Sequence, residues 1–207
     1  MTDNANGELQ ALVTSNPILS NAFRLFRDAD LLHSVGSYAT TIALAVLAFE
    51  EIGKYLLETW SAEDPKFSYK GHSTYHQSKQ AAVAALFLTE GARKEFRARK
   101  PDGGYAENVE GVTDMARAMI EGLRRRTGLV NAINGRVFDR MKNTSLYYDE
   151  GFAKNGPEPT SKDAADIMGM VSQAFTLLVE KGNIEIAKLA FPITQPKRSV
   201  SVRAGIE

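Results

Sequence analysis

The chain has 207 residues, of which 43% are hydrophobic and 24% charged, and its 25 lysines and arginines balance 25 aspartates and glutamates. This length and composition predict one soluble globular domain around a single core. The balanced charge gives no overall field that favours nucleic acid or a membrane, and the lack of cysteine excludes disulfides and thiolate metal sites. No basic stretch followed by an apolar run opens the chain, so no signal peptide is predicted and a cytoplasmic location is expected.

The first predicted helix begins at Pro17, with Asn16 or Ser15 as its cap. Residues 1–16 are expected to be a short N-terminal segment that precedes the helical domain. The second helix covers residues 36–60, is rich in alanine and leucine, and has apolar residues on nearly every face. We therefore place it at the centre of a bundle. Its apolar run is too short to cross a bilayer, so no membrane contact is predicted.

Three more helices follow in the sequence. The third begins around residues 71–73 and reaches Arg99. The fourth runs from about 107 to 141, with a bend near Gly128 or Gly135. The last starts after Thr160 or Ser161 and continues through Leu178, and an extension to Leu189 is left open. Residues 192–207 contain two prolines and no helical stripe, so this tail is expected to be extended or disordered. The prediction is an all-α, single-domain bundle of about five helices over residues 17–191.

The central helix ends in a polar segment that contains Glu50, Glu51 and Lys54. At about 100° per residue, Glu50 falls on the same stripe as the core residues, whereas Glu51 falls on the side nearer to water. Lys54 lies one turn after Glu50 and can pair with it. A carboxylate that points into apolar packing must be paired, protonated or used in chemistry. A structural ion pair that tethers another helix is the plainer interpretation.

A second polar cluster opens the third helix, where His72, His76, Lys79 and Gln80 share helical faces. His76 is either a residue that hydrogen-bonds a neighbour at the helix start or a group that transfers protons near neutral pH. The two histidines lack the glutamate of a His-Glu-x-x-His zinc motif. With only three histidines in the chain, neither a metal site nor another cofactor is predicted, and a carboxylate–histidine metal centre is a distant alternative.

The third cluster lies at the end of the fourth helix, between Lys142 and Asp149. Its amide, hydroxyl and phenol groups suit contact with phosphate and stacking on a nucleobase. Packing of its tyrosines on the core is the competing interpretation. This cluster consists of Lys142, Asn143, Thr144, Ser145, Leu146, Tyr147, Tyr148 and Asp149.

The first two clusters are expected to meet in one pocket. The connection between the second and third helices is short, which favours antiparallel packing of these two helices. Such packing would bring Glu50 and Lys54 beside His76 and Lys79, because opposite charges are more stable facing each other than facing hydrocarbon.

These motifs, taken in order, resemble the AbiV-type abortive-infection family of bacteria. The resemblance rests on Tyr38-Ala39 through Phe49-Glu50-Glu51-Ile52-Gly53-Lys54, on His76-x-x-Lys79, and on Leu146-Tyr147-Tyr148-Asp149, and it covers roughly residues 17 to 160. It implies a phage-defence protein that halts the host cell by blocking translation. It also implies kinship with HEPN helical domains, many of which are dimeric, metal-independent ribonucleases.

The chain departs from the usual HEPN ribonuclease motif, which has an arginine followed four to six residues later by a histidine. The matching segment has Lys142, Asn143 and then Tyr147 at the position of the histidine, while Arg140 can supply a guanidinium. A tyrosine is a weaker general base than histidine at neutral pH. His76 can instead supply the imidazole of an alternative site.

The resulting hypothesis is an antiviral effector that acts on RNA or on the translation machinery, with endoribonuclease activity as its enzymatic form. Proton transfer is assigned to His76 or Glu50, phosphate stabilisation to Lys54, Lys79 and Lys142, and orientation to Asn143 and Tyr147. The remaining candidates are Glu51 in the catalytic group and Arg140, Tyr148 and Asp149 for substrate binding. The competing hypothesis is a non-catalytic module that binds a phage or host protein, or RNA. The resemblance also favours a homodimer with residues 142–149 near the interface.

Overall fold

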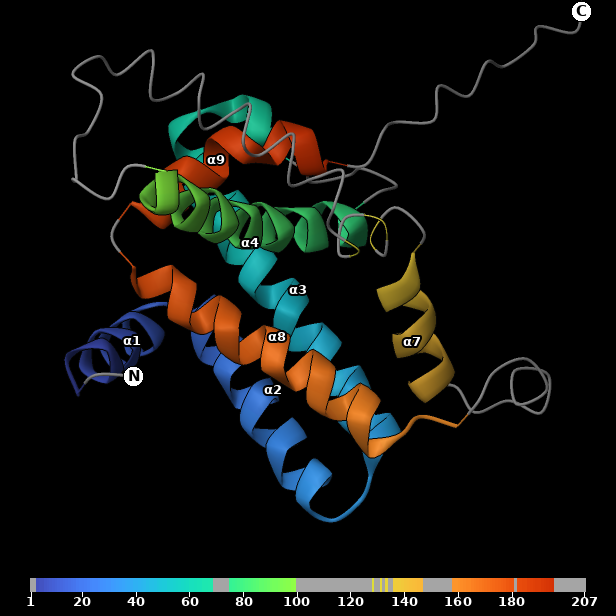
Figure 1. Cartoon of the computed structure of the whole chain (residues 1–207). Coiled ribbons are helices and arrows are strands. Elements are labelled where there is room, and N and C mark those ends of the chain that lie inside the picture. Colours follow the sequence, from blue (N-terminus) through green and yellow to red (C-terminus); the bar gives the residue numbers. More distant parts are fainter. Residues whose placement is uncertain are drawn as a thin grey trace, which may run out of the picture.

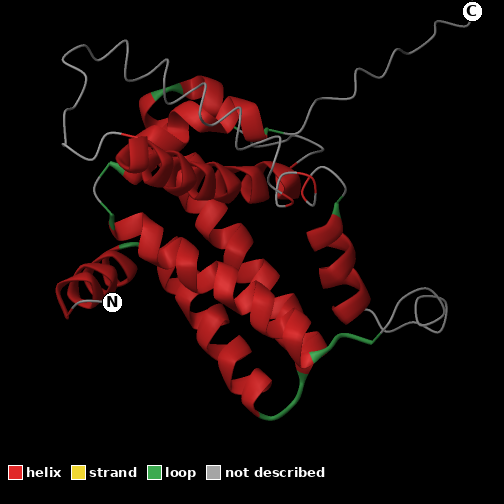
Figure 2. Cartoon of the chain, in the orientation of Figure 1, coloured by secondary structure: helices red, strands yellow, loops and turns green. Residues whose placement is uncertain are grey.

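A computed structural model describes residues 3–68, 75–99, 128, 131, 133, 136–146, 158–180 and 182–195. Its elements are α1 (Asp3–Ser15), α2 (Pro17–Ser34), α3 (Tyr38–Glu63), the 3-10 helix η1 (Pro65–Phe67), α4 (Tyr75–Arg99), α7 (Val137–Leu146), α8 (Ser161–Val179) and α9 (Asn183–Thr194). No strand occurs in these described ranges (Figure 2). The predicted all-α fold is confirmed, although this part of the chain already has seven α-helices rather than about five.

Helix α3 forms the centre of the molecule, with α2, α4, α7 and α8 packed around it (Figure 1). The alanines and leucines that make this segment helical also leave it without a polar face over most of its length. Its largest buried side chains are Ile42, Phe49, Ile52, Leu56, Leu57 and Trp60. Burial of each large apolar side chain stabilises the fold by roughly 1.5–3 kcal/mol. The central position predicted from the sequence is therefore correct.

The helix starts show the predicted caps. The side-chain oxygen of Asn16 accepts hydrogen bonds from the backbone N–H groups of Ile18 and Leu19, at 3.0 and 3.2 Å, with Pro17 at the first helical position. At the start of α8, the Thr160 hydroxyl accepts from the Asp163 backbone N–H, and the Asp163 carboxylate accepts from the Thr160 backbone. Both arrangements satisfy N–H groups that would otherwise lack partners in the first helical turn.

Two terminal segments differ from the sequence prediction. The residues assigned to a segment before the bundle form α1, which packs on α2 and α8 and buries Val13. At the other end, the chain turns at Gly182, where φ is 79°, so α9 is a separate helix and not an extension of α8. Helix α9 continues through Pro192 to Thr194, whose hydroxyl donates to the backbone oxygen of Ala81 at 2.8 Å and fixes α9 on α4.

The predicted fourth helix falls largely outside the described residues. Its last part is α7, which begins directly after Arg136, a residue with a φ of 55°. A left-handed residue at this position interrupts a helix, and it lies next to Gly135, where a bend was expected. Phe138 of α7 stacks on Phe49 of α3 at a ring distance of 5.6 Å, which holds the short helix against the centre.

Helix α4 crosses α3 instead of running beside it (Figure 1). The first two turns of α4 meet the middle of α3, because Glu50 contacts His76 and Gly53 lies against Lys79. In an antiparallel pair, the start of α4 would lie beside the end of α3. The predicted antiparallel packing is thus wrong, although the contact that it predicted between Glu50 and His76 does form. Among the described residues, no helix combines the length and the apolar content needed to cross a membrane.

Candidate functional site

The candidate site is centred on Glu50, whose side chain is only 2% exposed. The carboxylate projects from α3 into the space between α4 and α7. Its Oε1 accepts hydrogen bonds from Lys142 Nζ at 2.9 Å and Gln80 Nε2 at 3.1 Å. Its Oε2 lies 2.7 Å from His76 Nδ1 and 3.6 Å from Lys79 Nζ. Four side chains from two other helices therefore converge on one buried carboxylate.

Two opposing effects decide the charge of Glu50. Burial raises the pKa of the carboxyl group, but the hydrogen bonds and positive charges of Lys142 and His76 lower the pKa by more, so that it falls below its usual value of 4.5. Glu50 is consequently ionised at neutral pH. An ionised carboxylate accepts hydrogen bonds and cannot donate them, so Nδ1 of His76 must carry a hydrogen.

His76 is the exposed member of the cluster. Its side chain is 53% exposed, although its Nδ1 contacts a carboxylate that is almost completely buried. When the imidazole is neutral, a hydrogen on Nδ1 leaves Nε2 as the lone-pair nitrogen. Glu50 thus fixes both the orientation and the tautomer of a histidine that remains open to solvent. Tyr75 packs edge-on against the ring, with a centroid distance of 5.6 Å.

Lys79 is buried and has two electrostatic partners. Its Nζ lies 3.6 Å from Glu50 Oε2 and 4.2 Å from the centroid of the Tyr75 ring. Burial lowers the pKa of Lys79, and the attraction of Glu50 and Glu51 offsets only part of that effect. The contact with the tyrosine ring stabilises the cation in a place where little of it is exposed to water.

A close contact between two helices sets the position of these groups. A Cβ added to Gly53 would lie 1.9 Å from the backbone oxygen of Lys79. Only glycine fits there, so α3 and α4 approach each other more closely than two side-chain-bearing positions would allow. Glu50 lies one turn before Gly53, and His76 lies one turn before Lys79. The approach therefore brings Glu50 and His76 within hydrogen-bonding distance.

Two members of the cluster were not assigned from the sequence. Gln80 is fully buried, and its Nε2 donates to Glu50 Oε1 and also to Asp139 Oδ1 at 3.0 Å. Gln80 was predicted to share a helical face with His76, but no role in the site was assigned to it. Asp139 lies three residues before Lys142 and therefore on the same side of α7. Among the residues that the structure describes, none supplies a hydrogen-bond partner to the buried Oε1 atom of Gln80, an arrangement that costs stability.

The predicted ion pair between Lys54 and Glu50 does not form, and Lys54 pairs with Glu51 instead. Lys54 Nζ lies 3.7 Å from Glu51 Oε2, and the two side chains are 30% and 20% exposed. The carboxylate of Glu50 is surrounded by donors from α4 and α7 on the buried side of α3. Lys54 points to the more solvated side, where Glu51 lies at i, i+3 spacing. The structure thus brings together Glu50, His76 and Lys79, but not Lys54, in the pocket that was expected.

The third sequence cluster contributes Lys142 to the site. Lys142 is buried, whereas Arg140 and Asn143 lie on the exposed side of α7. Because the Lys142 ammonium group donates to Glu50, it is engaged in an internal ion pair and is not positioned as a free phosphate ligand. The predicted residues Tyr147, Tyr148 and Asp149 lie outside the described residues, as does His72.

The arrangement suits proton transfer by a histidine that a carboxylate holds in place. Lys142 and His76 favour the ionised form of Glu50, Lys79 and Gln80 add further contacts to its carboxylate, and Glu50 in turn directs His76. Hydrogen bonds to a ligand or a substrate can form at the exposed edge of His76 without any movement of the buried groups. Within the described ranges, no three histidine, aspartate or glutamate residues are grouped so that they could hold a metal ion.

Comparisons with known proteins identify one family. The family model HEPN_AbiV, described as AbiV, matches residues 10–178. This range includes every described residue of the Glu50 cluster. No curated protein and no solved structure matches the chain significantly.

Proposed function

This chain belongs to the HEPN-type AbiV family, and that membership points to abortive-infection defence. We propose that the protein is an anti-phage effector that cleaves RNA, with His76 as the catalytic group. The observation that carries the proposal is the 2.7 Å hydrogen bond between buried Glu50 and exposed His76. It supports a defined role for each residue of the pair.

Cleavage of a phosphodiester by the adjacent 2′-hydroxyl requires a group that removes a proton and a group that protonates the leaving oxygen. His76 Nε2 removes the proton from the 2′-hydroxyl, which attacks phosphorus as the bond to the 5′-oxygen breaks. The leaving 5′-oxygen takes a proton from water or from a second acid. Glu50 stabilises the imidazolium that forms, and it acts as a positioning residue because its own oxygens are occupied by four donors.

The lysines then have different roles. Lys79 and Lys142 act through Glu50, since both are buried against it. Lys54 and Arg140 lie closer to solvent, and we assign the contact with the substrate phosphate to these two cations. A functional homodimer in the cytoplasm is part of the same proposal.

The test is incubation of the purified protein with total RNA, with and without EDTA. We expect cleavage by the wild-type protein, at least 100-fold slower cleavage by His76→Ala in line with the usual effect of general acid–base groups, and wild-type cleavage by His33→Gln, a control histidine on α2. Glu50→Gln should also reduce cleavage, assayed under conditions in which circular dichroism shows that this destabilised variant is still folded. Intact RNA with wild-type protein under all conditions would refute the enzymatic proposal.

A second candidate function is supported by the burial of Lys79 and Lys142. An ion-pair cluster that joins α3, α4 and α7 can be wholly structural, in which case the protein arrests cells by binding RNA or a protein. This alternative predicts that His76→Ala preserves both toxicity on expression and protection against phage. Loss of both, with an unchanged circular dichroism spectrum, supports the enzymatic proposal instead.

A further inference from the structure

The side-chain amide of Gln80 is completely buried, and the catalytic proposal leaves it without a role. An amide nitrogen carries two hydrogens, and Nε2 of Gln80 has two acceptors, Glu50 Oε1 at 3.1 Å and Asp139 Oδ1 at 3.0 Å. Its Oε1 atom has no hydrogen-bond partner among the described residues. Folded proteins rarely leave a buried polar atom unsatisfied, so the orientation of this amide needs an explanation.

The two carboxyl groups explain why the amide keeps this orientation. A reversed amide would exchange Nε2 and Oε1 and place the amide oxygen against the oxygens of Glu50 and Asp139. The observed orientation therefore satisfies both acceptors, although it leaves Oε1 unsatisfied. Because both hydrogens of Nε2 lie in the amide plane, two acceptors together fix that plane. A single acceptor would leave the amide free to pivot about one hydrogen bond.

The fixed amide in turn sets the orientation of the Glu50 carboxylate. Lys142 also donates to Glu50 Oε1, at 2.9 Å, but an ammonium group on a flexible stem is a point charge with rotatable donors. The amide of Gln80 is planar and anchored at both hydrogens, so it is the more directional of the two donors. With Oε1 held in this way, Oε2 faces His76 Nδ1 at 2.7 Å.

We propose that Gln80 and Asp139 are positioning residues for His76. Asp139 fixes the amide of Gln80, the amide fixes the carboxylate of Glu50, and the carboxylate keeps the hydrogen of the neutral imidazole on Nδ1. This inference rests on the proposed catalytic role of His76 and adds two residues that do not touch the substrate. It extends the site to α7 by a route separate from Lys142.

A purely structural role for Asp139 makes a different prediction. Asp139 lies in the first turn of α7, where a negative charge stabilises a helix by itself. In that case its removal lowers the stability of α7 and leaves the ring of His76 unchanged. The hydrogen position on that ring therefore separates positioning from simple stabilisation.

The test is NMR of the histidine ring nitrogens in the full-length protein, at a pH at which the imidazole is neutral. The wild type should show His76 as a single tautomer with its hydrogen on Nδ1. Gln80→Met and Asp139→Leu should each give a mixture with the Nε2–H tautomer, because the Glu50 carboxylate is then free to turn. Asp139→Asn should stay close to the wild type, since its amide oxygen still accepts from Gln80. Circular dichroism establishes that each variant is folded.

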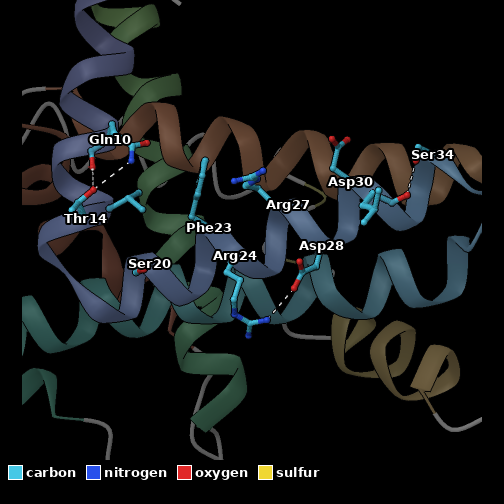
Figure 3. A pocket seen from close by; sticks show the side chains of 11 residues that line it. Gln10, Thr14, Ser20, Phe23, Arg24, Arg27, Asp28, Asp30 and Ser34 are labelled. Atoms are coloured by element: carbon cyan, nitrogen blue, oxygen red, sulfur yellow. Dashed lines mark hydrogen bonds and ion pairs between the residues drawn. The ribbon is translucent and has the colours of Figure 1, made fainter.

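Asp28→Leu on α2 is the matched control for Asp139→Leu. Asp28 is also half-buried and accepts a hydrogen bond, from Arg24 Nη1 at 2.9 Å. It lies in a groove of about 820 Å³ along α1 and α2, which is lined mostly by polar and charged side chains and by no member of the Glu50 cluster (Figure 3). This variant should leave the tautomer of His76 unchanged.

RNA cleavage by the same variants gives the second measurement. Gln80→Met and Asp139→Leu should lower kcat by roughly 10–100-fold, the range seen when partners that orient metal-binding histidines are removed. KM should not change, because neither residue touches the substrate. Asp139→Asn should restore most of the lost rate, and Asp28→Leu should cleave like the wild type.

The outcomes separate this inference from the proposed function. If His76 keeps a single Nδ1–H tautomer in both folded variants, Gln80→Met and Asp139→Leu, the inference is overturned. If the tautomer changes in these variants but the wild type cleaves no RNA, the positioning role is supported and only the catalytic role of His76 is refuted.

Discussion

Gly53 of α3 lies directly against the backbone carbonyl of Lys79 on α4, with no space for a side chain between them. This contact determines how closely the helices that carry Glu50 and His76 approach. The geometry of the candidate site therefore depends on a residue that has no functional group.

We expect Gly53→Ala to destabilise the protein by about 1–3 kcal/mol or more, because the new methyl group would overlap the Lys79 carbonyl and push the helices apart. Gly169→Ala on α8 is the matched control: a Cβ there meets nothing within 4 Å, and alanine favours a helix by roughly 0.5–1 kcal/mol over glycine. Urea unfolding measures both values. Equal stabilisation by the two substitutions would contradict the close contact.

Glu50→Gln should be strongly destabilising, by about 3–5 kcal/mol, because it leaves the buried lysines 79 and 142 without their carboxylate. Glu51→Gln provides a control on the same helix. Its ion pair with Lys54 is partly exposed, so its loss should cost only about 0–1 kcal/mol. Denaturant unfolding of the two variants under identical conditions gives the comparison, and similar losses would show that Glu50 is not the central charge.

The hydrogen bond between Glu50 and His76 should appear in a double-mutant cycle. Glu50→Ala and His76→Ala should each destabilise the fold, and the double variant should cost less than their sum by roughly 0.5–3 kcal/mol. The free energy of unfolding from chemical denaturation provides all four corners of the cycle. Simple additivity would mean that the two side chains do not interact in solution.

Gln80 provides another test of the network. Gln80→Glu should cost more stability than Gln80→Met, because it places a third carboxylate between Glu50 and Asp139, where Gln80 now donates to both. Gln80→Met also loses these hydrogen bonds. It removes the buried Oε1 atom that has no partner among the described residues, however, and so recovers the cost of an unsatisfied buried group, about 1–3 kcal/mol. Thermal unfolding ranks the two variants, and the reverse order would argue against the shared donor.

The acid stability of the protein should depend on Glu50. Its pKa in the folded state lies below the usual 4.5, so the unfolded chain binds a proton more readily as the pH falls. The stabilisation from ionised Glu50 is complete above the unfolded pKa and disappears as the pH falls through the folded pKa. NMR of glutamate labelled at Cδ should show Glu50 titrating below pH 4.5. A midpoint above that value would reverse the sign of this effect.

The sequence alone determined those features that arise within one helix or at its end. Helical spacing placed Glu50 among the core residues of α3, and polar residues next to proline or aspartate marked the starts of α2 and α8. These features depend on the 3.6-residue period and on local hydrogen bonds of the backbone, both of which act between residues a few positions apart. A buried carboxylate requires partners, and this requirement correctly predicted that Glu50 contacts His76.

Only the tertiary structure decided which partners reach Glu50 and by what route. Lys54 is four residues away but pairs with Glu51, whereas Lys142 is 92 residues away and donates to Glu50. The reason is that helix periodicity gives the direction of a side chain but not the angle at which two helices cross. Here the crossing depends on the contact of Gly53 with Lys79 and on the stacking of Phe138 against Phe49, and both of these interactions form only when distant segments pack together.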